Sequence, residues 1–144
     1  MTMPTVLILG TGRAESLEMS YARAFGRVHW KVERWDSHGA LAASSRGGRL
    51  GELLPKFFHV EPWLRKANVD LLQTVDRIRP DLILVIATSG IRAGSLAQAK
   101  VISPKTRIYM IYPDSPHSLD ADRIACLSIC DRVTVSSPAW VAAV

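Results

Sequence analysis

Short apolar runs that end at glycine or proline alternate along this chain with longer stretches of helical periodicity. The runs at 5–9, 81–86 and 107–112 are largely apolar, and the first stops at Gly10-Thr11-Gly12. A continuous apolar run is typical of a strand that is buried on both faces of a sheet. Such strands require helices on both faces, so this pattern favours an α/β fold built on a parallel sheet.

The stretches between these runs predict the helices. Leu17, Tyr21, Ala24 and Phe25 recur at helical spacing and predict a helix over about 15–27. A longer helix begins near Pro62 and ends before Pro80, with shorter helices around 93–100 and 120–128. Alternating residues with high β propensity at 28–35 and 132–136 predict two further strands.

Strands that alternate with helices form right-handed βαβ units. We therefore predict a Rossmann-like, five-stranded parallel sheet with helices on both faces and the strand order 3-2-1-4-5. A length of 144 residues, of which 48% are hydrophobic, fits a single domain over 1–144. Within it, 37–60 is predicted to be a mobile connection, because the composition shifts to Ser, Gly, Ala and Arg over 37–51, as a loop or a short mobile helix.

Ligands of such sheets bind beyond the carboxyl ends of the strands, where the strand order reverses. With the predicted order, the crevice lies between 10–13 and 112–115. We predict that Asp114, between two prolines, is the catalytic carboxylate, acting as a general base. The predicted ligand-binding residues, all at strand ends or in a first helical turn, are Gly10, Gly12, Arg13, Ser16, Glu18, Ser89, Gly90, Tyr112 and Ser115.

The glycine turn after the first strand matches only part of the dinucleotide-binding pattern. The third glycine of G-x-G-x-x-G is replaced by Glu15, and Glu18 follows one turn later. These carboxylates suit the positive end of the helix dipole, but they would compete there with a pyrophosphate. Asp36 lies where a ribose-binding acid would sit, but without the third glycine a turn or cap role is favoured.

Charge, cysteine content and apolar runs indicate which partners, metal sites and membrane segments to expect. The net charge is +5, but basic residues are not interleaved with aromatic ones, so we predict no nucleic-acid partner. Cys126 and Cys130 are predicted to be small core residues, and no histidine or cysteine spacing predicts a metal site. With no apolar run of about 18 residues, we predict no transmembrane segment and a cytoplasmic location. The uncharged stretch 138–144, with Trp140, predicts packing against another surface, most simply in a homodimer, or alternatively as a short terminal helix folded back on the sheet of a monomer.

Four segments resemble one enzyme group when they are taken together. They are Leu9-Gly10-Thr11-Gly12, the Ser-Leu-Glu segment over 16–25, Arg-Pro-Asp-Leu at 79–82 and Tyr-Pro-Asp-Ser-Pro at 112–116. They resemble the N-terminal half of glycosyltransferases of the GT-B fold, and most closely the spore-maturation, CgeB-like group. Gly10, Gly12, Ser16, Glu18 and Asp114 match the pattern of that group.

The resemblance implies an enzyme of two Rossmann-like domains, in which the first binds the sugar acceptor and the second binds the nucleotide sugar. We therefore expect an acceptor-binding domain that is inactive until a C-terminal donor-binding domain or a partner chain completes the cleft. The nucleotide sugar is then a donor substrate, and no cofactor is expected. Alternatives are a stand-alone Rossmann-like module that binds a nucleotide or a small regulatory ligand without catalysis, and a structural subunit without a ligand.

Overall fold

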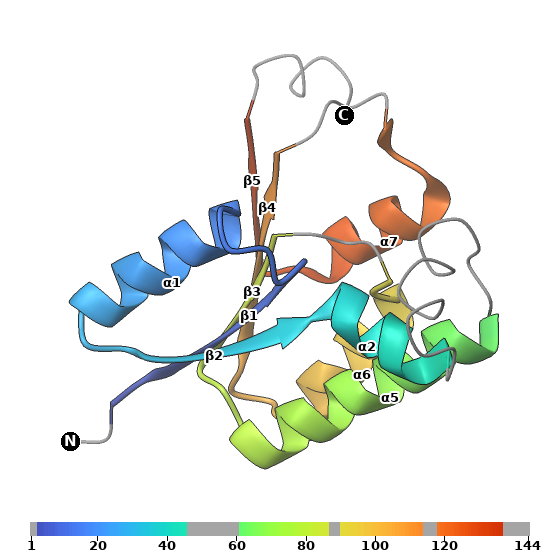
Figure 1. Cartoon of the computed structure of the whole chain (residues 1–144), viewed down its shortest axis with the longest axis horizontal. Helices are drawn as coiled ribbons and strands as arrows, with labels where there is room; N and C mark the ends of the chain where they lie inside the picture. Colours follow the sequence, from blue (N-terminus) through green and yellow to red (C-terminus); the bar gives the residue numbers. More distant parts are fainter. Residues whose placement is uncertain (1–2, 46–60, 87–89, 114–117, 137–144) are drawn as a thin grey trace.

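The computed structural model describes residues 3–45, 61–86, 90–113 and 118–136 of the chain. Its centre is a five-stranded sheet in which every pair of neighbouring strands is parallel (Figure 1). The strands are β1 (Thr5–Gly10), β2 (Lys31–Asp36), β3 (Leu82–Val85), β4 (Arg107–Tyr112) and β5 (Arg132–Val135). The predicted Rossmann-like α/β class is confirmed.

Helix α1 (Leu17–Arg27) covers one face of the sheet, and four other described helices cover the opposite face (Figure 1). These are α2 (Ser37–Ser45), α5 (Glu61–Ile78), α6 (Ala93–Ile102) and α7 (Ala121–Ile129). Side chains of β1 and β3 alternate between two cores: Val6 and Leu84 lie in one, and Leu7 and Val85 in the other. Both strands therefore need apolar residues at every position, which explains their continuous apolar runs.

The strand order is β2-β1-β3-β4-β5, so the predicted order 3-2-1-4-5 is wrong in the position of the third strand. β3 pairs directly with β1, with Leu82 beside Val6. All four residues of β3 are buried, and a strand that is apolar on both faces belongs in the interior of a sheet. β2 carries Lys31, Glu33 and Arg34 and forms an edge of the described sheet, where charges deter pairing with other chains.

β2 also begins three residues later than the alternating pattern at 28–35 predicts. Residues 28–30 instead follow the C-terminus of α1, and their amides donate to carbonyl oxygens of its last turn. The Trp30 amide donates to the Phe25 carbonyl oxygen at 3.0 Å, and His29 has a positive φ of 61°. The rings of Phe25 and Trp30 meet edge to face with centroids 5.3 Å apart, an arrangement that aromatic pairs favour.

Two sequence predictions fall partly outside the described residues. Of the predicted connection over 37–60, the first nine residues form α2, whose Leu41 is buried in the core. Residues 46–60 lie outside the described residues. The same holds for 137–144, the segment on which the predicted homodimer depends.

Both cysteines pack as the sequence predicts. Cys126 is fully buried in the core, and Cys130 is partly buried against the same cluster. Burial is the main cause that raises the pKa of the Cys126 thiol to about 12 and that of Cys130 to about 11. Among the described helices, none has the length and apolar character needed to cross a bilayer.

Candidate functional site

The strand order reverses between β1 and β3, so a ligand crevice is expected at the carboxyl ends of these two strands. The crevice predicted between β1 and β4 is displaced by one strand, because β3 lies between them. The loop after β1 is fully described. Ser89, Asp114 and Ser115 lie outside the described residues, so their predicted roles stay predictions.

Glu18 is a buried acid directly beneath the glycine turn. Its side chain is 6% exposed, although it lies in the first turn of α1. Its Oε1 accepts two hydrogen bonds from Thr11, one from the amide at 2.8 Å and one from the hydroxyl at 3.2 Å. A Cβ at position 10 would collide with the Glu18 side chain, so Gly10 provides the space for this carboxylate.

The environment of Glu18 keeps its carboxyl group ionised. Burial by itself would raise the pKa of Glu18, but hydrogen bonds from Ser16 and from Thr11 outweigh that effect and lower it. The Ser16 hydroxyl lies within reach of this carboxylate and also donates to the Arg13 carbonyl oxygen at 2.6 Å. A fixed negative charge therefore lies under the turn that follows β1.

Asp36, at the end of β2, faces the same turn. Gly12 has a φ of +71°, and a Cβ added there would lie 2.6 Å from the Asp36 carboxyl group. On the other side, the His38 amide donates to Asp36 Oδ1 at 3.0 Å. The Ser37 hydroxyl, which is fully buried, donates to the Gly10 carbonyl oxygen at 3.1 Å and ties the start of α2 to the end of β1.

These residues surround a pocket of about 160 Å³ between the glycine turn, the start of α1 and the end of β2. It is lined by Ile8, Gly10, Gly12, Ser16, Glu18, Arg34, Trp35 and Asp36. Four predicted ligand-binding residues, Gly10, Gly12, Ser16 and Glu18, therefore come together. Sequence reasoning missed Arg34 and Trp35. Their position at the end of β2, next to Asp36, could have indicated them, because the predicted strand order already placed the first two strands side by side.

The other described candidates lie elsewhere. Arg13 is exposed in the loop after β1 and is not among the residues that line this pocket. Tyr112 is 3% exposed in the main core, and its hydroxyl is hydrogen-bonded to that of Ser118 at 2.8 Å. Its strand, β4, is separated from β1 by β3. Tyr112 therefore lies away from the pocket at the glycine turn, and its role in ligand binding stays a prediction.

Gly90 begins the described part of the connection between β3 and α6. Its φ is +77°, and a Cβ there would lie 2.8 Å from Leu41 Cδ1. The Asn68 side chain holds this turn: its Nδ2 donates to the Gly90 carbonyl oxygen at 2.8 Å, and its Oδ1 accepts from the Arg92 amide at 3.0 Å. Gly90 therefore permits close packing of the turn against α2 and α5.

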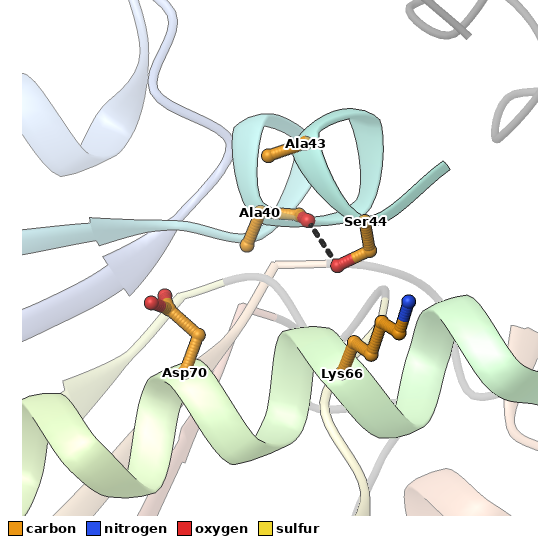
Figure 2. A pocket seen from close by; sticks show the side chains of 5 residues that line it. All are labelled: Ala40, Ala43, Ser44, Lys66 and Asp70. Atoms are coloured by element: carbon orange, nitrogen blue, oxygen red, sulfur yellow. Dashed lines mark hydrogen bonds between the residues drawn. The ribbon is translucent and has the colours of Figure 1, made fainter. Parts of the chain in front are cut away.

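A second, larger pocket of about 410 Å³ lies between α2 and α5 (Figure 2). Ala40, Ala43 and Ser44 line it from α2, and Lys66 and Asp70 from α5 (Figure 2). The Ser44 hydroxyl is already used within α2, because it donates to the Ala40 carbonyl oxygen at 2.7 Å. This pocket has fewer polar groups and none of them is buried, whereas Glu18 is buried at the glycine turn, so the pocket at the glycine turn is the better candidate site.

Within the described segments, no three side chains of the His, Cys, Asp and Glu types gather closely enough to hold a metal ion. Comparison with known proteins adds no assignment: no family model matches the chain, and no curated protein matches it significantly.

Proposed function

We propose that this chain is the acceptor-binding domain of a glycosyltransferase. It would transfer a sugar from a nucleotide sugar only when a donor-binding domain or partner chain completes the cleft. One observation carries the proposal: the buried Glu18 carboxylate occupies the place under the glycine turn where a phosphate-binding domain would present free amides.

The hydrogen bonding at this turn selects against phosphates. The Thr11 amide, a donor that a phosphate could use, is already bound to Glu18. The lowered pKa of Glu18 keeps the carboxylate charged at neutral pH, and a negative charge repels a phosphate. Hydroxyl groups can donate to a carboxylate, so the site favours an uncharged ligand rich in hydroxyls, such as a sugar acceptor.

In the complete enzyme, the role of this half is to bind and orient the acceptor. Holding the acceptor hydroxyl in line with the donor removes much of the entropic barrier to transfer. Asp114 remains our proposed general base, which takes the proton from that hydroxyl as it attacks. Because the donor wall of the cleft belongs to another domain or chain, we expect no measurable transfer by this chain in isolation.

The nucleotide-binding alternative has one observation in its favour. The order β2-β1-β3-β4-β5 also occurs in flavodoxin-like domains, and Asp36 lies beside Gly12 at the end of β2, a position suited to the hydroxyls of a ribose. A nucleotide would, however, have to place its phosphates near the charged Glu18.

Amide chemical shifts distinguish the two functions. The chain is titrated with uridine diphosphate and, separately, with the methyl glycosides of glucose, galactose, mannose and N-acetylglucosamine at millimolar concentrations. The proposed function predicts shifts at Gly10, Gly12 and Ser16 with at least one glycoside and none with the diphosphate. Shifts with the diphosphate but with no glycoside would identify a nucleotide-binding module instead.

A further inference from the structure

We infer that the pocket between Glu18 and Asp36 binds a vicinal diol of an uncharged sugar ring, and that Asp36 is the residue that selects the diol. The inference rests on the proposed function, because it names the class of acceptor that the site takes.

The volume of the pocket is close to that of one sugar ring and smaller than that of a whole nucleotide. Its volume is about 160 Å³. One water occupies about 30 Å³ of liquid, so the pocket has room for about five waters, which is close to the size of one sugar ring. Sites for drug-sized ligands are larger, at about 300–1,000 Å³.

The two oxygens of Asp36 have different surroundings. Oδ1 accepts the His38 amide, which fixes the orientation of the carboxyl group. Oδ2 faces two glycines: an added Cβ would lie 2.6 Å from it at Gly12 and 2.7 Å from it at Gly39. The absence of a side chain at both glycines therefore gives Oδ2 the room that it occupies beside the turn.

The lining of the pocket is complementary to hydroxyl pairs. Glu18 and Asp36 are acceptors and the Arg34 guanidinium supplies donors, while the Ser16 hydroxyl, which donates to the Arg13 carbonyl oxygen, can still accept a hydrogen bond. A sugar hydroxyl both donates and accepts, so adjacent hydroxyls can use both kinds of group. An anionic sugar would face two carboxylates with one arginine to offset them, and a simple cation would face that arginine.

The test compares ligands with and without a diol on the intact chain. Binding of methyl α-D-glucopyranoside and the other three glycosides is followed by amide shifts at Gly12 and Asp36. Tetrahydropyran-2-methanol, which keeps the ring and one hydroxyl but lacks the diol, is titrated in parallel, as is glucose 6-phosphate. We expect shifts with at least one glycoside, and binding at least fivefold weaker for the other two compounds.

The variant Asp36→Asn isolates the role of the carboxylate. Asparagine keeps an oxygen for the His38 amide, so the fold is retained, which the amide spectrum itself verifies. We expect the responding glycoside to bind at least fivefold more weakly. Glu33→Gln is the matched control, because Glu33 lies on the same strand, pairs with Lys31 at 3.1 Å and does not line the pocket.

The outcomes separate this inference from the proposed function. Unchanged glycoside binding in Asp36→Asn, or equal binding of the compound without the diol, overturns the inference and leaves the proposed function standing. Failure of all four glycosides to shift any amide at the glycine turn of the wild-type chain overturns both.

Discussion

The indole nitrogen of Trp35 donates to the Asp70 carboxylate at 2.8 Å and joins the end of β2 to the middle of α5. Trp35 is 5% exposed and lines the pocket at the glycine turn, whereas Asp70 lines the pocket between the two helices. One hydrogen bond thus fixes a wall of the candidate site to the helix layer beneath it.

Replacing Asp70 with alanine should destabilise the fold. The indole N–H of Trp35 would lose its charged partner in a partly buried hydrogen bond, which costs about 1–3 kcal/mol. Urea unfolding followed by tryptophan fluorescence measures the change. Asp76→Ala is the control, because its pair with Arg79 on the same helix is exposed and should contribute less than about 1 kcal/mol. Equal losses in the two variants would contradict the role assigned to the Trp35 bond.

Two glycines should respond to alanine in opposite directions. Gly12→Ala would be strained by its positive φ and by contact with Asp36, and should cost at least about 1–2 kcal/mol. Gly26 lies inside α1 with open space around it, so Gly26→Ala should stabilise the protein by about 0.5–1 kcal/mol. Thermal unfolding of both variants checks the prediction, which fails if Gly12→Ala is neutral.

Removing the charge at position 18 should relax the selection against anions. Glutamine in Glu18→Gln keeps an oxygen for the Thr11 amide but removes the repulsion, so uridine diphosphate should begin to shift the Gly10 and Gly12 amides. Glu15→Gln is the matched control, because Glu15 is exposed in the same loop. If both variants respond alike, the buried carboxylate is not the source of the selection.

Asp131 should make stability depend on pH in the acid range. Its carboxylate accepts from the Ile108 amide at 2.8 Å and from Lys100 at 2.9 Å, and these interactions lower its pKa. A lowered pKa adds stability that is fully present above the unfolded-state pKa of about 3.9 and is lost as the pH falls through the folded-state pKa. The Asp131→Asn variant should therefore be less stable by about 1 kcal/mol at pH 7.

That difference should begin to shrink below about pH 4, where Asp131 of the unfolded chain takes up a proton, and should disappear once the pH has fallen below the lowered pKa of the folded state. Urea unfolding of both proteins between pH 2 and pH 7 measures it. If the difference in the free energy of unfolding is as large at pH 2 as at pH 7, the charge of Asp131 contributes nothing to stability.

The sequence predicted the elements better than their arrangement. The apolar runs and the alternating stretches located all five described strands, because periodicity reflects which faces are buried. The strand order depends on which edges meet, and periodicity does not encode that. The four consecutive apolar residues that form β3, all of which are buried, were the signal in the sequence for a central position.

The candidate site was predictable in part for the same reason. Gly10, Gly12, Ser16 and Glu18 are neighbours in sequence, so their grouping follows from one turn. Arg34 and Asp36 join them only through the pairing of β2 with β1. Glu18 was predicted near the ligand, but its burial against Thr11 depends on the path of the turn, which sequence spacing does not specify.

The pairing of β1 with β3 has a consequence for the order in which the chain folds. Roughly three times as many residues separate Val6 from Leu82 as separate Thr5 from Lys31, so closing the larger loop costs about 1 kcal/mol more in chain entropy. The unit β1-α1-β2 is therefore the local nucleus available first, and it already carries Gly12, Glu18 and Asp36. We therefore expect the polar half of the candidate site to be assembled by short-range folding, before the centre of the sheet closes.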